Sequence, residues 1–562
     1  MRVPALRRIR AVFRRETVGH DAIAGIVLGI ESVPDGLASG LLAGVNPIAG
    51  LYAYLFGMAG SAVFASSALM AVQATGAMSL IVADADLKGA PDPKVALFTL
   101  SVLTGVLMII AGLLKGGRLL RFVPTAVMVG FITAVGVNIA LGQLTDFTGS
   151  DESGANRIAK AFNIVVHLGH IHWPTLAVGG VTFLMILVLT NTRLRSFGLV
   201  IAVVAGSVLA GILNGLLHVD IKTVADVANV PTGLPAPVLP SLKDVPALIV
   251  PALSLTFVGL VQGAAVSSSV PNPDGSRQDS SQDFIGQGAG NVVSGIFRGM
   301  PVGGSTSASM LIVAAGAKTR LALFIAAGVM AFVVLVASGA VSLVAMPSLA
   351  ALLIVVGITS IKPARVRSVM KTGVLQTTVM AVTFVLTLLI PLQFAVLVGV
   401  GLGIVLYVAR QSNRLRLRQV VYEGDRPREQ DPDPTVGPHS VMLLQPDGSL
   451  FFASAPVLEG LLPRVDDATR GSVVILRLRG VDQLGLALVQ VLSRYARELA
   501  HCQSSLRLVI TSDQVRAELV AGGLVREIGD DSIYRGTEWL GATSRRAVAD
   551  AEAWVRGADT AL

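Results

Sequence analysis

The sequence predicts an α-helical polytopic membrane protein that carries a small α/β domain at its C-terminal end. Only 14% of the 562 residues are charged and the mean hydropathy is +0.71, whereas a soluble globular chain carries about a quarter charged residues. Apolar segments follow one another as far as residue 410, and after residue 438 the composition becomes that of a soluble domain. A bilayer is therefore the expected solvent for the first two thirds of the chain.

About fourteen membrane segments are expected between residues 21 and 410. Several of them are shorter than the roughly 20 residues that a simple span needs, and the clearest short ones begin near Leu69 and Ser305. They recur at corresponding places in the two halves, 21–216 and 246–410, which is typical of inverted repeats with a binding site between broken helices. The expected segments are 21–41, 46–64, 69–84, 95–114, 122–142, 174–190, 197–216, 246–268, 284–298, 305–316, 320–340, 342–359, 374–390 and 392–409.

The basic residues predict the orientation of these segments. Residues 1–20 are rich in arginine, and Glu31 and Asp35 interrupt the first apolar run, so we expect a transmembrane helix and not a signal peptide. With the N-terminus inside, 22 Lys and Arg residues fall on inner stretches and 7 on outer ones. Basic residues concentrate in cytoplasmic loops. We therefore expect a multi-pass protein of the cell (inner) membrane with both termini cytoplasmic.

The polar segment at 411–437 is predicted to be a linker, and residues 438–558 are predicted to form a soluble domain. Strands are expected at 440–444, 450–453, 473–478 and 506–511, with helical stretches between them. This alternation predicts a small α/β layer domain.

Four stretches of this sequence resemble the SulP family of anion transporters, which includes sulfate, bicarbonate and dicarboxylate carriers and prestin. They are IESVPDGLASGLLAGVNPIAGLYAYLFG at 30–57, VQATGAM at 72–78, RQDSSQDFIGQGAGNVVSGIFRGMPVGGSTSASMLIVAAGAKTRL at 277–321, and VVILRLRGVDQLG at 473–485, which is similar to a STAS domain. The resemblance implies seven plus seven inverted segments divided into a core and a gate, an elevator-like movement, a small anion as substrate and a homodimer.

The resemblance also implies where the substrate binds: the third and tenth segments would begin with extended stretches whose half-helix N-termini meet at the membrane midplane. Helix N-termini present free N–H groups and a partial positive charge, which suits an anion. The residues at these two starts are Gln73, Thr75, Gly76, Ser305, Thr306 and Ser307. Hydroxyls at a helix start also serve as caps or allow close packing, and that reading stays open.

Two departures from the family pattern bear on the coupling ion. Ala308 stands where many anion-carrying relatives have arginine, and Gln262 stands where relatives usually have a carboxylate that helps to hold sodium. Glu31 and Asp35 are acids placed at membrane depth, where a charge is costly. We expect burial to favour the neutral form of Glu31, so that it carries a coupling proton, with Asp35 sharing it; sodium is the less favoured ion.

Two alternatives to this carrier remain. One is a nucleobase-type carrier of the same architecture, and the other is a membrane anion sensor that signals through its soluble domain. No nucleophile–base pair, metal-ligand cluster or phosphate-binding loop of the GxxxxGK[ST] type is evident. We therefore expect no enzyme activity, no cofactor, no metal and no nucleic-acid partner.

Overall fold

The computed structural model describes residues 15–117, 124–192 except 151, 153 and 155, 197–227, 233–391, scattered positions from 394 to 411, 415–536 except 425 and 479, and 542–559. The chain divides into two compact units, Met1–Gly403 and Ile404–Leu562. The last expected membrane segment, 392–409, and the N-terminal residues 1–14 lie largely outside the described residues.

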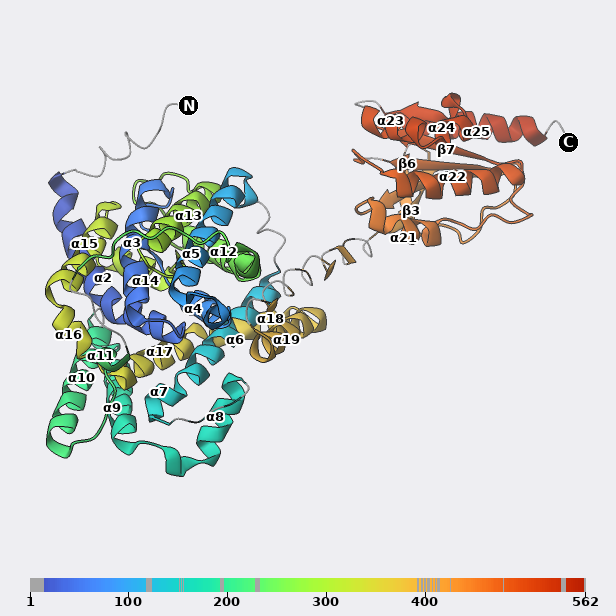
Figure 1. Ribbon diagram of the computed structural model, residues 1–562. Coiled ribbons are helices and arrows are strands. Elements are labelled where there is room, and N and C mark those ends of the chain that lie inside the picture. The colour runs from blue at the N-terminus through green and yellow to red at the C-terminus, as the bar shows by residue number, and fades with distance from the viewer. Residues whose placement is uncertain are drawn as a thin grey trace. The chain divides into compact units, whose positions relative to one another are not determined.

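The first unit consists of two groups of helices, which Figure 1 shows as an upper and a lower set. We call the first the core group, within which α13 packs on α3 and α5, and α2 packs on α3 and α15. It contains α2 (Arg15–Leu42), α3 (Pro47–Phe64), α4 (Gly76–Ala83), α5 (Pro93–Leu113), α12 (Val245–Ser269), α13 (Ser280–Ile296), α14 (Thr306–Ala314) and α15 (Leu321–Val336).

We call the second set the gate group, within which α17 packs on α6 and α9, and α19 packs on α6. It contains α6 (Thr125–Gly142), α7 (Leu144–Thr148), α8 (Arg157–Val166), α9 (Trp173–Leu189), α10 (Gly198–Leu217), α17 (Met346–Ser360), α18 (Pro363–Lys371) and α19 (Val374–Leu389). Short helices α11 (Val224–Val227) and α16 (Ser338–Ser342) lie between longer ones in the chain. Seven described helices are long and apolar enough to span a membrane, and three more apolar helices are shorter.

Glycine lets the core helices approach one another closely. A Cβ atom on Gly288 of α13 would lie 2.6 Å from the Gly105 carbonyl oxygen of α5, and one on Gly105 would lie 2.6 Å from the Gly288 oxygen. Such distances leave no room for a larger residue at either position. These glycines of the apolar segments therefore serve helix packing.

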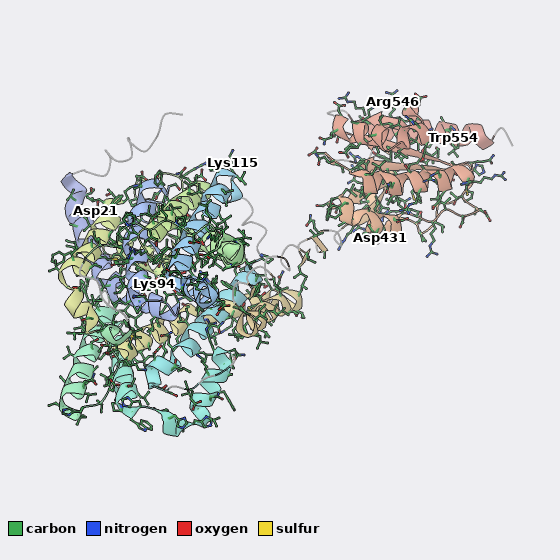
Figure 2. The ribbon with its side chains drawn as sticks, viewed as in Figure 1. Asp21, Lys94, Lys115, Asp431, Arg546 and Trp554 are labelled. Carbon is green, nitrogen blue, oxygen red and sulfur yellow. The ribbon has the colours of Figure 1, made fainter. Side chains whose placement is uncertain are left out.

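Two buried aspartates fasten the ends of helices that were predicted to lie on the same, inner side. Asp283 of α13 accepts hydrogen bonds from the backbone N–H and the hydroxyl of both Ser66 and Ser67, and from the Ser267 hydroxyl, at 2.6–2.8 Å. Asp21, labelled in Figure 2 on α2, accepts from the Lys318 and Thr319 N–H groups and the Thr319 hydroxyl. The gathering of these ends agrees with the predicted alternation of the segments.

The ends predicted outside are also joined to one another. Arg157 at the start of α8 forms a 2.7 Å ion pair with Asp84, the residue that ends α4. The Ser241 N–H donates to the Thr99 hydroxyl of α5 at 2.8 Å. Asp84 belongs to the core group and Arg157 to the gate group, so this ion pair connects the two sets.

The second unit is a six-stranded sheet with helices on both faces. Its strands are β3 (Arg416–Glu423), β4 (Arg426–Gln430), β5 (Val441–Asp447), β6 (Val473–Leu478), β7 (Ser505–Ile510) and β8 (Ile533–Arg535), in the order β4-β3-β5-β6-β7-β8. Strands β5 to β8 are parallel, and β3 is antiparallel to both of its neighbours. Its helices are α21 (Ala455–Leu461), α22 (Leu486–His501), α23 (Asp513–Ala521), α24 (Leu524–Ile528) and α25 (Ala542–Asp559).

Alternate residues of β6 supply two separate hydrophobic clusters. Val474, Leu476 and Leu478 pack with α21, α22, α23 and α24 on one face. Val473 and Ile475 pack on the other face with α25, the helix on which Figure 2 labels Arg546 and Trp554. Residues 473–476 are buried on both faces, which explains their continuous apolar sequence; Arg477, which follows them in β6, is only partly buried.

Two expectations for this unit were wrong in detail. The segment expected to be a linker, 411–437, contains the hairpin β3–β4, which extends the sheet through the pairs Arg416–Asp447 to Gln419–Leu444. Residues 450–453 do not form a strand; a 3-10 turn, Phe452–Ser454, leads into α21, and the Ser454 hydroxyl bonds to the Phe451 backbone.

Candidate functional site

Two very short strands bring the predicted half-helices together. β1 (Val72–Gln73) pairs antiparallel with β2 (Gly303–Gly304), with Val72 opposite Gly304 and Gln73 opposite Gly303. α4 begins three residues after β1 and α14 begins two residues after β2. The N-termini of both half-helices therefore lie beside one strand pair, as expected from the sequence.

The backbone of β2 is held by two buried amides of α13. The Gly304 N–H donates to Gln287 Oε1 at 3.0 Å, and Asn291 exchanges two hydrogen bonds with the backbone of Val302, at 2.7 and 2.8 Å. Sequence analysis missed both residues, although they lie inside the quoted motif at 277–321. Gln287 Nε2 is buried and has no hydrogen-bond partner within the described part of the chain.

Glycine is required where β2 passes α12 and α4. A Cβ atom on Gly303 would lie 2.6 Å from the Met78 sulfur atom, and one on Gly304 would lie 2.9 Å from Gly263 Cα. This close approach lets the two half-helices start within reach of the same small ligand.

The hydroxyls of Thr75 and Ser305 act as N-caps. Thr75 Oγ1 accepts from the Met78 N–H at 3.5 Å and donates to Gln262 Oε1 at 3.0 Å. Ser305 Oγ accepts from the Ala308 N–H at 3.3 Å. Gln262, singled out for lacking a charge, is therefore part of the site through Thr75.

The remaining predicted site residues differ in what they can offer a ligand. Gln73 is buried and its Nε2 donates to Ser32 of α2 at 2.9 Å, so it fastens β1 to α2. Ser307 is exposed, with its hydroxyl 3.2 Å from Ser305 Oγ, and Ala308 is buried. Thr306 is half-buried, and its hydroxyl makes no hydrogen bond to any described residue.

Ser309, next to the predicted residues, connects the two half-helix entries. Its hydroxyl accepts from the Ala71 N–H at 2.9 Å and donates to the Ser305 oxygen at 2.6 Å. The Ser305 N–H in turn donates to the Ala71 oxygen at 2.8 Å. These bonds fix the distance between the start of β1 and the start of α14.

The two acids of α2 lie on the turn that touches β1. The Tyr54 hydroxyl oxygen lies 2.6 Å from Asp35 Oδ2 and 2.9 Å from the Ala74 oxygen, both within hydrogen-bond distance. Ala74 immediately precedes Thr75. Glu31 is half-buried and makes no hydrogen bond or ion pair in the part of the chain that the structure describes.

The arrangement offers partial positive charge without a fixed cation. The first N–H groups of a helix have no partner within it, and α4 and α14 direct these groups toward the strand pair. Gly76, Thr75, Gln262, Ser305 and Thr306 stay partly accessible among buried neighbours. A small anion is the ligand that such a site suits.

Comparisons with known protein families identify the family of the chain. Residues 18–383 match the Sulfate permease family, and residues 434–539 match the STAS domain. The chain belongs to the sulfate permease family. As a member of this family it is a multi-pass membrane transporter of anions and not an enzyme.

The individual relatives have low sequence identity to this chain but cover most of it. "Probable sulfate transporter Rv1739c" of Mycobacterium tuberculosis is 25% identical over 543 residues, 93% of this chain and 94% of that protein. "Bicarbonate transporter BicA" of Picosynechococcus is 27% identical over 403 residues, 70% of each chain. The solved structure of SLC26A9 has a TM-score of 0.83 at 19% identity and covers 98% of this chain and 93% of its own.

Proposed function

We propose that this member of the sulfate permease family is a secondary active carrier of a small inorganic or carboxylate anion. The observation that carries the proposal is the convergence of α4 and α14 on the β1–β2 pair. The anion would bind to the first N–H groups of both helices and to the Thr306 hydroxyl. Neither Gln262 nor Ala308 adds a fixed charge, so the helix ends supply the attraction.

Sulfate, bicarbonate and dicarboxylates are the substrate classes to test. Relatives named for sulfate and for bicarbonate both align with most of this chain. Both anions are small and carry several acceptor oxygens, which helix N-termini and hydroxyls can bind.

We infer that transport is elevator-like: the core group, which carries the site, moves against the gate group. The separate packing of the two groups supports this division. The protein would act as a homodimer in the cell (inner) membrane, with both termini in the cytoplasm, as the basic residues and the family resemblance indicate.

Protons are the proposed coupling ion. Gln262 has no charge for sodium, whereas Glu31 and Asp35 lie on the turn of α2 that bonds to β1 through Ser32. When both acids are neutral they do not repel an arriving anion. Proton and anion then favour each other's binding, which is the requirement for symport.

The test is uptake of labelled sulfate, bicarbonate and succinate into proteoliposomes, each with and without an imposed proton or sodium gradient. We expect one of these anions to accumulate, and a proton gradient but not a sodium gradient to drive it. Exclusion of all three anions would refute the proposed function. Binding without flux would instead support a sensor.

Replacing Glu31 tests its part in coupling. Glu31→Gln mimics the protonated form, so we expect it to keep anion exchange at equal pH and to lose accumulation driven by a pH gradient. Glu423→Gln, at an exposed position at the end of β3 in the second unit, is the matched control and should behave like wild type. Accumulation by Glu31→Gln under a proton gradient alone would show that Glu31 is not the coupling residue.

A further inference from the structure

Four oxygen atoms form a connected cluster between α2, α3 and the residue before Thr75. The Tyr54 hydroxyl is 2.6 Å from Asp35 Oδ2, 2.9 Å from the Ala74 oxygen and 3.2 Å from Ser39 Oγ. Ser39 Oγ is 3.1 Å from the same Ala74 oxygen. Tyr54, Ser39 and Ala74 are buried. None of these three residues has a part in the proposed function so far.

Counting protons shows which form of Asp35 fits this cluster. The four short contacts each need one hydrogen atom between the two oxygens. With Asp35 ionised, only the Tyr54 and Ser39 hydroxyls supply hydrogens, so two contacts join oxygens with nothing between them. With Asp35 protonated, a chain runs from Asp35 to Tyr54 and from Tyr54 to the Ala74 carbonyl, and Ser39 donates a third bond to the same carbonyl. Only the longest contact, 3.2 Å between the Tyr54 and Ser39 hydroxyls, is then left without a hydrogen. The geometry therefore fits the neutral acid better.

Among the described residues, the helices packed around Asp35 carry no cation that would stabilise its ionised form. The helices that pack most closely on α2 are α3, α4, α10, α14, α15 and α17. Among their residues, only Tyr52 and Tyr54 of α3 are titratable or charged. On α2 itself, Glu31 lies one turn away from Asp35. A buried carboxylate without a counter-charge is expensive, so Asp35 depends on the hydrogen-bond chain.

We propose that Tyr54 is a positioning residue that transmits the protonation state of Asp35 to the junction between β1 and α4. This inference rests on the proposed function, because that junction carries half of the anion site. When Asp35 loses its proton to water, the Tyr54 hydroxyl turns toward the carboxylate. The Ala74 oxygen then faces the Tyr54 oxygen at 2.9 Å without a hydrogen between them, and repulsion moves the residue that precedes Thr75.

The consequence is a defined coupling between proton and anion. A proton on Asp35 holds Ala74, and with it the Thr75 cap and the first N–H groups of α4, in the arrangement that binds the anion. Loss of the proton loosens that arrangement. The two ligands therefore bind cooperatively through Tyr54, even though Asp35 itself need not touch the anion.

Tyr54→Phe tests the transmission, since it keeps the ring and removes only the hydroxyl. Tyr52→Phe is the matched control, because Tyr52 lies two residues earlier on α3 and its hydroxyl donates to the Gly233 oxygen at 3.3 Å. The readouts are the pH dependence of the apparent affinity and uptake driven by a proton gradient, measured with whichever of sulfate, bicarbonate and succinate the wild type takes up fastest.

We expect Tyr54→Phe to reduce the change in affinity between low and high pH by about tenfold, the effect of one lost hydrogen bond of this kind, and to lower gradient-driven uptake while exchange at equal pH persists. Tyr52→Phe should match the wild type. Asp35→Asn, whose amide can donate to Tyr54 as the neutral acid does, should bind the anion with an affinity that depends less on pH than that of the wild type, the remaining dependence being due to Glu31.

The outcomes separate this inference from the proposed function. If wild type accumulates the anion on a proton gradient and Tyr54→Phe retains its full pH dependence, the transmission through Tyr54 is refuted while the carrier stands. If wild-type uptake does not respond to the proton gradient and the apparent affinity for the anion is independent of pH, both proton coupling and the inference are refuted. If Tyr54→Phe does not fold, an affinity in Asp35→Asn that keeps the full pH dependence of the wild type overturns the inference.

Discussion

At the scale of single residues, hydroxyl groups at the two helix starts divide into caps and free donors. Thr75 and Ser305 use their oxygens to accept helix N–H groups, so their identity is explained by helix initiation alone. Thr306 differs, because its hydroxyl has no partner among the described residues although the side chain is half-buried. It is therefore the hydroxyl best placed to bind a ligand.

Thr306→Val should weaken anion uptake by raising the apparent KM about tenfold, since one hydrogen bond to a charged ligand is lost and the shape is kept. The protein should still purify as a folded species, because no bond within the described chain is broken. Thr359→Val on α17 is the control, since the Thr359 hydroxyl bonds only to its own helix. An unchanged KM in Thr306→Val would remove Thr306 from the site.

The composition of the two helix starts could be predicted from the sequence, but the partners of their side chains could not. Gln73 was predicted as a ligand residue, and its bond to Ser32, 41 positions earlier, could not be foreseen. Gln287 and Asn291, which hold the β2 backbone, were not singled out at all. Each of these roles depends on a contact between distant segments, which neither spacing nor periodicity contains.

At the scale of elements, the hairpin β3–β4 shows why a strand can be mistaken for a linker. Its sequence is rich in arginine and glutamate because β4 is an exposed edge, and Pro427 and Gly424 resemble linker residues. Yet Leu417 and Val420 of β3 are buried, one in each hydrophobic cluster of the unit. An edge strand needs only its inward residues to be apolar, and such a pattern is weak in sequence.

This hairpin predicts how the second unit must be cut to fold alone. A fragment of residues 415–562 should be soluble and unfold cooperatively in urea, because both clusters are complete within it. A fragment of residues 438–562 should lose several kcal/mol of stability, about 1.5–3 for each buried apolar side chain removed, and should expose the edge of β5. Equal urea midpoints, followed by circular dichroism, would show that β3 adds nothing to this unit.

At the scale of the whole molecule, hydropathy and charge predict a number of segments and their alternation, because a bilayer constrains every helix in the same way. The count of fourteen stays a prediction, since the described residues include seven helices long and apolar enough to span a membrane and three shorter apolar ones. The division into core and gate came only from resemblance to a family, since it depends on which helices pack together. The connections between the two groups are likewise absent from the sequence pattern. The Asp84–Arg157 ion pair joins residues 73 positions apart.

If the core group moves against the gate group, the Asp84–Arg157 contact cannot persist through the transport cycle. We therefore expect that linking these positions arrests transport. In a Cys502→Ser background, Asp84→Cys and Arg157→Cys would be joined by a short bis-methanethiosulfonate reagent. Uptake should fall to the level of empty liposomes and return with dithiothreitol. The uptake of each single-cysteine variant should not change when the reagent is added, whatever loss of uptake the missing ion pair itself causes.

A second pair makes the result specific to movement between the groups. Thr99→Cys with Ser241→Cys joins α5 to the residues before α12, both on the core side, at positions where the Ser241 N–H lies 2.8 Å from the Thr99 hydroxyl. This link should leave uptake intact, because its two ends move as one body. Arrest by both pairs would indicate general damage, and full activity of the linked Asp84–Arg157 pair would show that the two groups do not separate at this end.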